Sequence, residues 1–188
     1  MKKWTMIPLL LAFMLLFTAC SPSNTVRVSQ GDTPGLGSDI DTSYLLPGGK
    51  DYTVAVGLWH NGEITTLDSL ENISLTKEET LQLGGTGESF VEGKWSWKIR
   101  LGEKALDVPV PEDRVEAPGA TYDLGEKDFE PKPGDEYLLA YAAGMASNIM
   151  DTSTLSSFSK WSSLTEAGQE ELLSKFSYVY LVTLKVTE

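Results

Sequence analysis

A period-two alternation of apolar and polar residues is the feature that most restricts what this chain can fold into. It is clearest in 95–101, where Trp, Trp, Ile and Leu take every second position and Ser, Lys and Arg lie between them. Successive side chains of a strand point to opposite faces of a sheet, so this segment predicts a strand with one buried face. Gly102-Glu103 supplies a two-residue turn, and the alternation resumes in 106–110. Pro109 predicts that this returning strand lies at a sheet edge.

Similar patterns predict strands along most of the chain. Residues 52–59 are rich in β-branched and aromatic side chains, and Asn61-Gly62 separates them from a second such run at 63–67. Asn-Gly between two strands indicates a tight hairpin, because both residues tolerate positive φ. The glycine-rich segment 84–87 is interpreted as a flexible turn, and the acidic, proline-rich segment 111–135 as a connection. Further strands are expected within 73–83, at 136–143 and at 178–186.

One helix is expected near the C-terminus. Residues 164–175 have helical composition, and Ser163 with Glu166 has the spacing of a capping box. Many short strands with close turns and a single short helix predict a mainly β fold, a β-sandwich of loosely immunoglobulin-like form. The disulfide of antibody domains cannot form within the chain, because the chain contains one Cys. We recognise no specific domain family in it.

The N-terminal residues have the pattern of a secretion signal. Lys2 and Lys3 precede an apolar run of 12 residues, Met6–Phe17. A helix that spans a bilayer needs about 20 apolar residues, so this run is too short for a permanent transmembrane anchor. A short apolar run behind lysines is typical of a signal peptide.

The apolar run leads to the only cysteine of the chain. Phe17-Thr18-Ala19-Cys20 resembles the lipobox of bacterial lipoproteins, with Phe17 at the position where Leu is usual. The resemblance implies that residues 1–19 are removed and that Cys20 becomes an N-terminus carrying diacylglycerol and acyl chains such as palmitate. The protein would then be exported and anchored by lipid to the outer face of a bacterial membrane, either the cell membrane or an outer membrane. An ordinary signal peptide that happens to end in a Cys is the alternative.

Residues 20–43 are predicted to be the lipidated Cys and a flexible tether. Ser, Gly, Pro, Asp, Thr and Asn dominate from Ser21 to Ser43, which is the composition of a linker. Residues 44–188 then form a single β-rich domain outside the cytoplasm. The alternation within 25–29 leaves a second interpretation open, in which this stretch pairs as an edge strand and the domain begins before Tyr44.

Charge restricts the partners of this domain. The chain carries 15 basic and 27 acidic residues, a formal charge of −12, and removal of the leader with Lys2 and Lys3 makes it −14. Affinity for nucleic acid comes largely from Lys and Arg on phosphates, so no nucleic-acid partner is expected. Anionic lipid headgroups repel an acidic domain, so the lipid has to hold the protein at the membrane.

No motif for catalysis or for a metal ion is recognised. His60 is the only histidine, and it is expected at the tip of a hairpin rather than beside a Ser nucleophile. Residues 39–43 have the Asp-x-Asp-x-Ser spacing that opens a calcium loop, but Tyr44 and Lys50 occupy the positions that require Gly and Glu. The acids of 112–136 are interpreted as a solvated loop.

Aromatic side chains carry the binding hypotheses. Trp95 and Trp97 lie on the predicted buried face of their strand, so they are assigned to the core. Trp59, beside a turn, and Trp161, in the Ser- and Thr-rich connection 147–163, are the candidate ligand-binding residues. An exposed indole at either position would suit a carbohydrate or the centre of a protein interface.

The favoured function is a non-enzymatic, membrane-anchored binding or protein-interaction module at the cell envelope. Its expected partner is an envelope protein, and no cofactor is predicted beyond the covalent lipid on Cys20. A carbohydrate- or envelope-polymer-binding domain is the first alternative, and it would expose Trp59 or Trp161. A hydrolase that uses carboxylates is the second, and it would hold two acids about 5–10 Å apart in a cleft.

Overall fold

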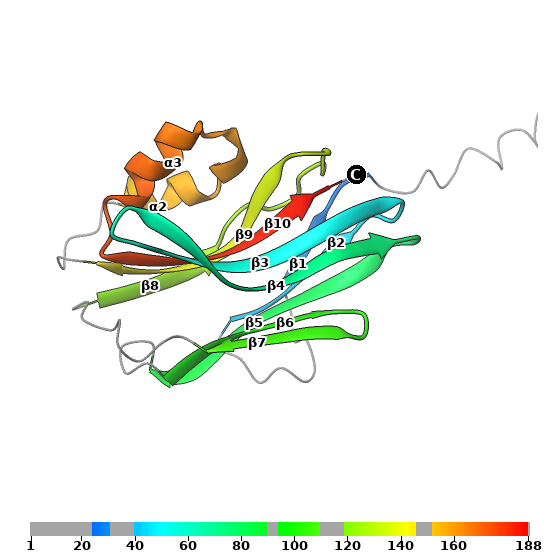
Figure 1. The fold of residues 1–188 in the computed structure, drawn as a ribbon, viewed down its shortest axis with the longest axis horizontal. Helices are drawn as coiled ribbons and strands as arrows, with labels where there is room; N and C mark the ends of the chain where they lie inside the picture. The colour runs from blue at the N-terminus through cyan, green and yellow to red at the C-terminus, as the bar shows by residue number, and fades with distance from the viewer. Residues whose placement is uncertain (1–23, 31–39, 90–93, 110–118, 146–151, 188) are drawn as a thin grey trace, which may run out of the picture.

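A computed structural model describes residues 24–30, 40–89, 94–109, 119–145 and 152–187. They form two five-stranded sheets packed face to face, with a small helical layer on the far side of one of them (Figure 1). Every pair of neighbouring strands is antiparallel. The mainly β fold and the β-sandwich predicted from the sequence are confirmed.

The chain passes between the two sheets three times. It crosses from the first sheet to the second after β2, returns after β4, and crosses again after β7. The first sheet has the order β1-β2-β5-β6-β7, with β1 (Arg27–Gln30), β2 (Ile40–Leu46), β5 (Glu79–Ser89), β6 (Lys94–Leu101) and β7 (Lys104–Pro109). The second sheet has the order β4-β3-β10-β9-β8, with β4 (Glu63–Leu75), β3 (Lys50–His60), β10 (Tyr178–Val186), β9 (Glu136–Met145) and β8 (Gly119–Leu124).

The predicted tight turn between β3 and β4 is confirmed. Asn61 and Gly62 join the two strands with φ angles of 54° and 87°, and His60 pairs with Glu63 on either side of them. Positive φ at both turn residues matches the twist of the flanking strands, which explains the choice of Asn-Gly. Pro109 ends β7 at the edge of the first sheet, also as predicted.

The glycine-rich segment 84–87 is not a turn, as predicted from the sequence, but the middle of β5. Gly85 pairs with Trp97 of β6, whose side chain is fully buried. Paired residues of an antiparallel ladder project to the same face, so the missing side chain at Gly85 leaves room for the indole. Glycine at this position therefore serves packing rather than chain reversal.

The sheet begins before Tyr44, so the boundary predicted between tether and domain is too late. β1 and the start of β2 lie within the segment 20–43, as the alternative interpretation of 25–29 proposed. Val26 is fully buried and bridges to Phe129. The predicted signal peptide, Cys20 and the remainder of the tether lie outside the described residues.

Three short helical elements cover part of the outer face of the second sheet (Figure 1). They are α2 (Thr152–Phe158), the 3-10 turn η2 (Trp161–Ser163) and α3 (Glu166–Leu173), and together we call them the helical cap. The sequence predicts only α3, and with a different start. Thr165 is its N-cap and accepts a hydrogen bond from the Gly168 N–H, whereas the Ser163 hydroxyl donates to the Lys160 carbonyl. None of the described helices is both long and apolar enough to cross a membrane.

The first half of β10, in the middle of the second sheet, is buried on both faces. Successive side chains of β10 point to opposite faces of the sheet. Tyr180, Val182 and Leu184 pack into the core between the sheets. Val179 and Leu181 pack under the helical cap. All of them are nearly inaccessible to solvent. This double burial explains the unbroken apolar run at 178–182, and the polar Thr183 and Lys185 follow where the outer face is half-buried and then exposed.

A β-bulge in β9 changes which face its residues use. The register with β10 shifts between Val182 and Thr183, which leaves Leu139 without a partner on β10. Leu139 and Ala140 are adjacent in sequence, yet both lie in the core between the sheets. An extra residue on one strand reverses the alternation in this way, and it changes the direction of the neighbouring backbone N–H and carbonyl groups.

Gly125 offers a test of how tightly the β8–β9 connection packs on β9. A Cβ at this position would overlap the backbone carbonyl of Leu138, which cannot move without disturbing the ladder. We expect Gly125→Ala to lower the free energy of unfolding by about 2 kcal/mol, measured by urea denaturation. Gly168→Ala is the matched control, because its Cβ would make only ordinary contacts and a glycine in α3 costs about 1 kcal/mol relative to Ala. The control should therefore be stabilised, and equal effects of both substitutions would contradict the packing.

Candidate functional site

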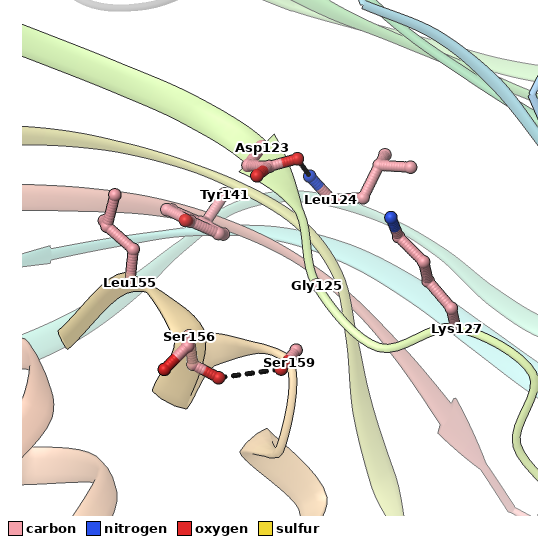
Figure 2. A pocket seen from close by; sticks show the side chains of 8 residues that line it. All are labelled: Asp123, Leu124, Gly125, Lys127, Tyr141, Leu155, Ser156 and Ser159. Carbon is pink, nitrogen blue, oxygen red and sulfur yellow. Dashed lines mark hydrogen bonds between the residues drawn. The ribbon is translucent and has the colours of Figure 1, made fainter. Parts of the chain in front are cut away.

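A pocket of about 490 Å³ opens between the helical cap and the end of β8 (Figure 2). We call it the cap pocket. Segments that are distant in the sequence form it: the end of β8 with the connection that follows, β9, and α2 with the turn after it. Sites for small molecules are concave and combine apolar walls with a few polar groups, so the cap pocket is the candidate site. Its lining residues are Asp123, Leu124, Gly125, Lys127, Tyr141, Leu155, Ser156 and Ser159.

Asp123 and Tyr141 form one side of the cap pocket (Figure 2). One carboxylate oxygen of Asp123 accepts a hydrogen bond of 2.7 Å from the Leu124 N–H. The Tyr141 ring stacks on Phe158 of α2, with the ring centroids 4.0 Å apart. Burial, and after it the negative charge of Asp123, raises the pKa of Tyr141 above its ordinary value. The phenol therefore stays protonated and can donate a hydrogen bond.

Ser156 and Ser159 lie across the pocket from this pair (Figure 2). The Ser159 hydroxyl donates to the Ser156 carbonyl at 2.7 Å, and the Ser156 hydroxyl donates to the Ser153 carbonyl at 2.8 Å. A hydroxyl has one proton, so both side-chain oxygens are left to act as acceptors. Leu155 adds an apolar surface at one end of the pocket.

Residues 125–127 form a strap that leads from β8 along the bulged part of β9. The first two N–H groups of the strap donate to the carbonyls of Leu139 and Leu138, at 2.9 and 2.7 Å. The Tyr44 hydroxyl on β2 donates to the same Leu139 carbonyl at 2.6 Å. One carbonyl thus joins the first sheet, the second sheet and the strap, and the strap is held firmly as a wall of the cap pocket.

Glu126 fastens the strap to the helical cap. Its side chain is 6 % exposed, and one carboxylate oxygen accepts hydrogen bonds from the N–H and the hydroxyl of Ser162, at 3.0 and 2.6 Å. The other oxygen has no hydrogen-bond partner among the described residues. Burial raises the pKa of Glu126, the hydrogen bonds from Ser162 counteract the rise, and the charge of Asp135 adds to it. The buried environment therefore favours the protonated carboxyl more than water does.

Trp59 and Trp161 are buried, so neither forms the exposed platform predicted from the sequence. Trp59 is 8 % exposed and Trp161 is 3 % exposed, and both pack in the cluster under the helical cap. Trp161 stacks near Phe158, with the ring centroids 6.4 Å apart. The described part of the Ser- and Thr-rich segment contains α2 and η2, and its two aromatic residues, Phe158 and Trp161, are buried while most of its serines are exposed. Its polar composition reflects this amphipathic arrangement, which is why it suggested an exposed connection.

The other described residues singled out in the sequence lie in different parts of the fold. His60 lies at the end of β3 beside the turn, as predicted, and is half-buried. In the acidic connection, Asp123 lines the cap pocket, Glu126 is buried, and Asp128 accepts a hydrogen bond from the backbone of β1 at 3.3 Å. Within the described residues, no three His, Cys, Asp or Glu side chains are grouped so that they could hold a metal ion.

Sequence reasoning missed the residues of the cap pocket. Asp123 and Lys127 belong to a segment interpreted as a solvated connection, and Ser156 and Ser159 to one interpreted as a polar linker. The only signal available was local polarity, which most surface loops share. The pocket arises because the strap and α2 lie close together on the outer face of the second sheet. No sequence pattern within either segment predicts that contact.

No protein-family model matches this chain, and the comparisons with curated proteins and with solved structures also gave no match. Its function is therefore inferred from its own residues.

The raised pKa of Glu126 predicts that the wild-type protein loses stability as the carboxyl ionises, whereas a Gln at this position does not ionise. The folded protein holds this proton more tightly than the unfolded chain, in which the carboxyl has its ordinary pKa of 4.5. The contribution of Glu126 to stability is therefore complete below pH 4.5 and is lost as the pH rises through the higher pKa of the folded state. We expect Glu126→Gln to gain stability relative to the wild type between about pH 4 and pH 7, measured by urea denaturation at each pH.

Ser162→Ala is the matched control for this experiment. It removes the hydroxyl that stabilises the ionised carboxylate, so it should raise the pKa of Glu126 further and lower the stability at neutral pH by about 1 kcal/mol. Glu126→Gln should thus become more stable relative to the wild type as the pH rises, whereas Ser162→Ala should be less stable than the wild type at neutral pH. A difference between Glu126→Gln and the wild type that stays constant with pH would show that Glu126 has its ordinary pKa in the folded state.

Proposed function

We propose that this protein is a bacterial lipoprotein whose β-sandwich serves as a non-enzymatic binding module on the outer face of the membrane. The leader supports the anchor: two lysines, a short apolar run and small residues before Cys20. The lipid holds the acidic domain at a membrane that would otherwise repel it. The domain then presents its binding site to a component of the cell envelope.

The observation that carries the binding role is the cap pocket. It is a concavity of about 490 Å³ with charged and hydroxyl groups along its walls, and small molecules bind in concave sites that offer a few polar groups. Its walls are held by hydrogen bonds: the strap is bonded to β9 and, through Glu126, to Ser162 of the cap. A pocket with such walls binds a ligand without first having to order them.

Neither alternative function finds equal support. A saccharide platform at Trp59 or Trp161 conflicts with the burial of both indoles. A carboxylate-dependent hydrolase needs a pair of acids, and Asp123 is the only acid among the described residues that line the cap pocket. Binding without chemistry is the function that the arrangement of these residues favours.

Replacement of Cys20 tests the anchor. We expect the wild-type protein to sediment with membranes and to yield an N-terminal peptide carrying acyl chains, detected by mass spectrometry. Cys20→Ser should remove the lipid and shift the protein away from the membrane fraction after cleavage or leave an unprocessed precursor, because two acyl chains are needed for stable anchoring. An unmodified Cys20 in the mature wild-type protein would overturn the lipoprotein assignment.

Site-directed cross-linking tests the binding role in intact cells. A photo-reactive amino acid at Ser156 would lie in the cap pocket, whereas the same group at Lys104 would lie on β7 at the exposed edge of the other sheet. We expect a defined adduct, identified by mass spectrometry, from position 156 and none from position 104. Absence of an adduct at both positions, or the same adducts at both, would contradict a binding role for the cap pocket.

A further inference from the structure

Two residues of opposite charge line the cap pocket. Asp123 lies beside Tyr141 at one part of the wall, and Lys127 extends from the strap at another (Figure 2). Four peptide steps join Asp123 to Lys127, so their Cα atoms are at most about 14 Å apart. A single small ligand can therefore contact both charges, and the ligand that gains most from them carries two opposite charges of its own.

The hydroxyl groups specify which end of the ligand lies where. Ser156 and Ser159 use their protons on backbone carbonyls, so toward the pocket they act as acceptors. Together with the carboxylate of Asp123, they favour a group that donates several hydrogen bonds and carries positive charge. An ammonium group has three donors and meets this requirement, whereas a carboxylate at this position would face these acceptors and have the Tyr141 hydroxyl as its donor.

The cap pocket also has an apolar part. Leu155 lines it from α2, whereas the side chain of Leu124, at the end of β8, packs in the core between the sheets. The one aromatic lining residue, Tyr141, has its ring face stacked on Phe158, so this face is not available to pack on a sugar. Aliphatic methylene groups therefore suit this part of the pocket better than a pyranose ring.

We propose that the cap pocket binds a linear aliphatic zwitterion, a molecule with an ammonium group at one end and a carboxylate at the other, such as a free ω-amino acid or the lysine at the C-terminal end of a peptide. The ammonium contacts Asp123 and the serine oxygens, the methylenes pack on Leu155, and the carboxylate pairs with Lys127. The proposal rests on the proposed function, because it names the ligand class of the same pocket.

The test uses the full chain purified in detergent and three matched probes, with binding measured by calorimetry. 6-Aminohexanoate carries both charges, hexylamine carries only the ammonium, and hexanoate carries only the carboxylate. We expect 6-aminohexanoate to bind about tenfold more tightly than either single-charge probe, because each charged contact contributes to affinity. Equal affinity for 6-aminohexanoate and hexylamine would remove Lys127 from the site and overturn the proposal.

Two variants assign the ends of the ligand. Asp123→Asn should weaken binding of 6-aminohexanoate and hexylamine, and Lys127→Gln should remove the advantage of 6-aminohexanoate over hexylamine. Both side chains are exposed, and the matched controls Asp107→Asn on β7 and Lys132→Gln outside the pocket are exposed as well. Loss of affinity in the controls as large as in the variants would show that net charge, and not the pocket, attracts the probe.

The outcome also separates this proposal from the binding role itself. If no probe binds but the photo-reactive group at Ser156 still gives a defined adduct in cells, the cap pocket is a binding site for another ligand class and only the zwitterion proposal fails. If no probe binds and position 156 gives no adduct, both proposals fail. Binding of 6-aminohexanoate that depends on Asp123 and Lys127 supports both.

Discussion

Burial of β10 on both faces at 178–182 is the constraint on which the rest of the structure depends. β10 sends Tyr180 and Val182 into the core between the sheets and Val179 and Leu181 under the helical cap. Without the cap, these outward residues would form an exposed apolar patch in the middle of the sheet, which soluble domains avoid. The helical cap is therefore a third layer of the fold rather than an addition to a finished sandwich, and its edge is where the candidate site lies.

The Leu139 carbonyl links this layered core to the site. The bulge in β9 frees that carbonyl from the β10 ladder, and the Tyr44 hydroxyl and the first N–H of the strap both donate to it. From there the strap reaches the cap through Glu126, whose carboxylate accepts two hydrogen bonds from Ser162. A chain of short contacts thus runs from the first sheet to the wall of the cap pocket. Burial of a carboxylate in this chain is unfavourable for its charge, which makes the junction sensitive to pH.

Most strands could be predicted because the signal for a half-buried strand lies within the strand itself. The alternation that ends at Leu101 predicts a strand from its own residues, and Asn61-Gly62 predicts a tight turn from two residues. The prediction of a turn at 84–87 was wrong because the role of these glycines depends on Trp97 of the neighbouring strand and not on the residues next to them in sequence. The prediction of an exposed Trp161 was wrong for the same reason. The exposure of its indole depends on the sheet beneath it, and its polar neighbours in sequence do not indicate that contact.

By itself the sequence determined the β-rich character of the domain, its main hairpins, its acidic charge and the pattern of a lipoprotein leader, because each of these is a local or additive property of the chain. Only the tertiary structure decided that Trp59 and Trp161 are buried, that the proton of Glu126 is held more tightly than usual, and that one pocket gathers a carboxylate, a lysine and two serines. These properties depend on which distant segments meet. Burial and electrostatic environment belong to the contact between the strap, β9 and the helical cap, and none of the three segments specifies that contact alone.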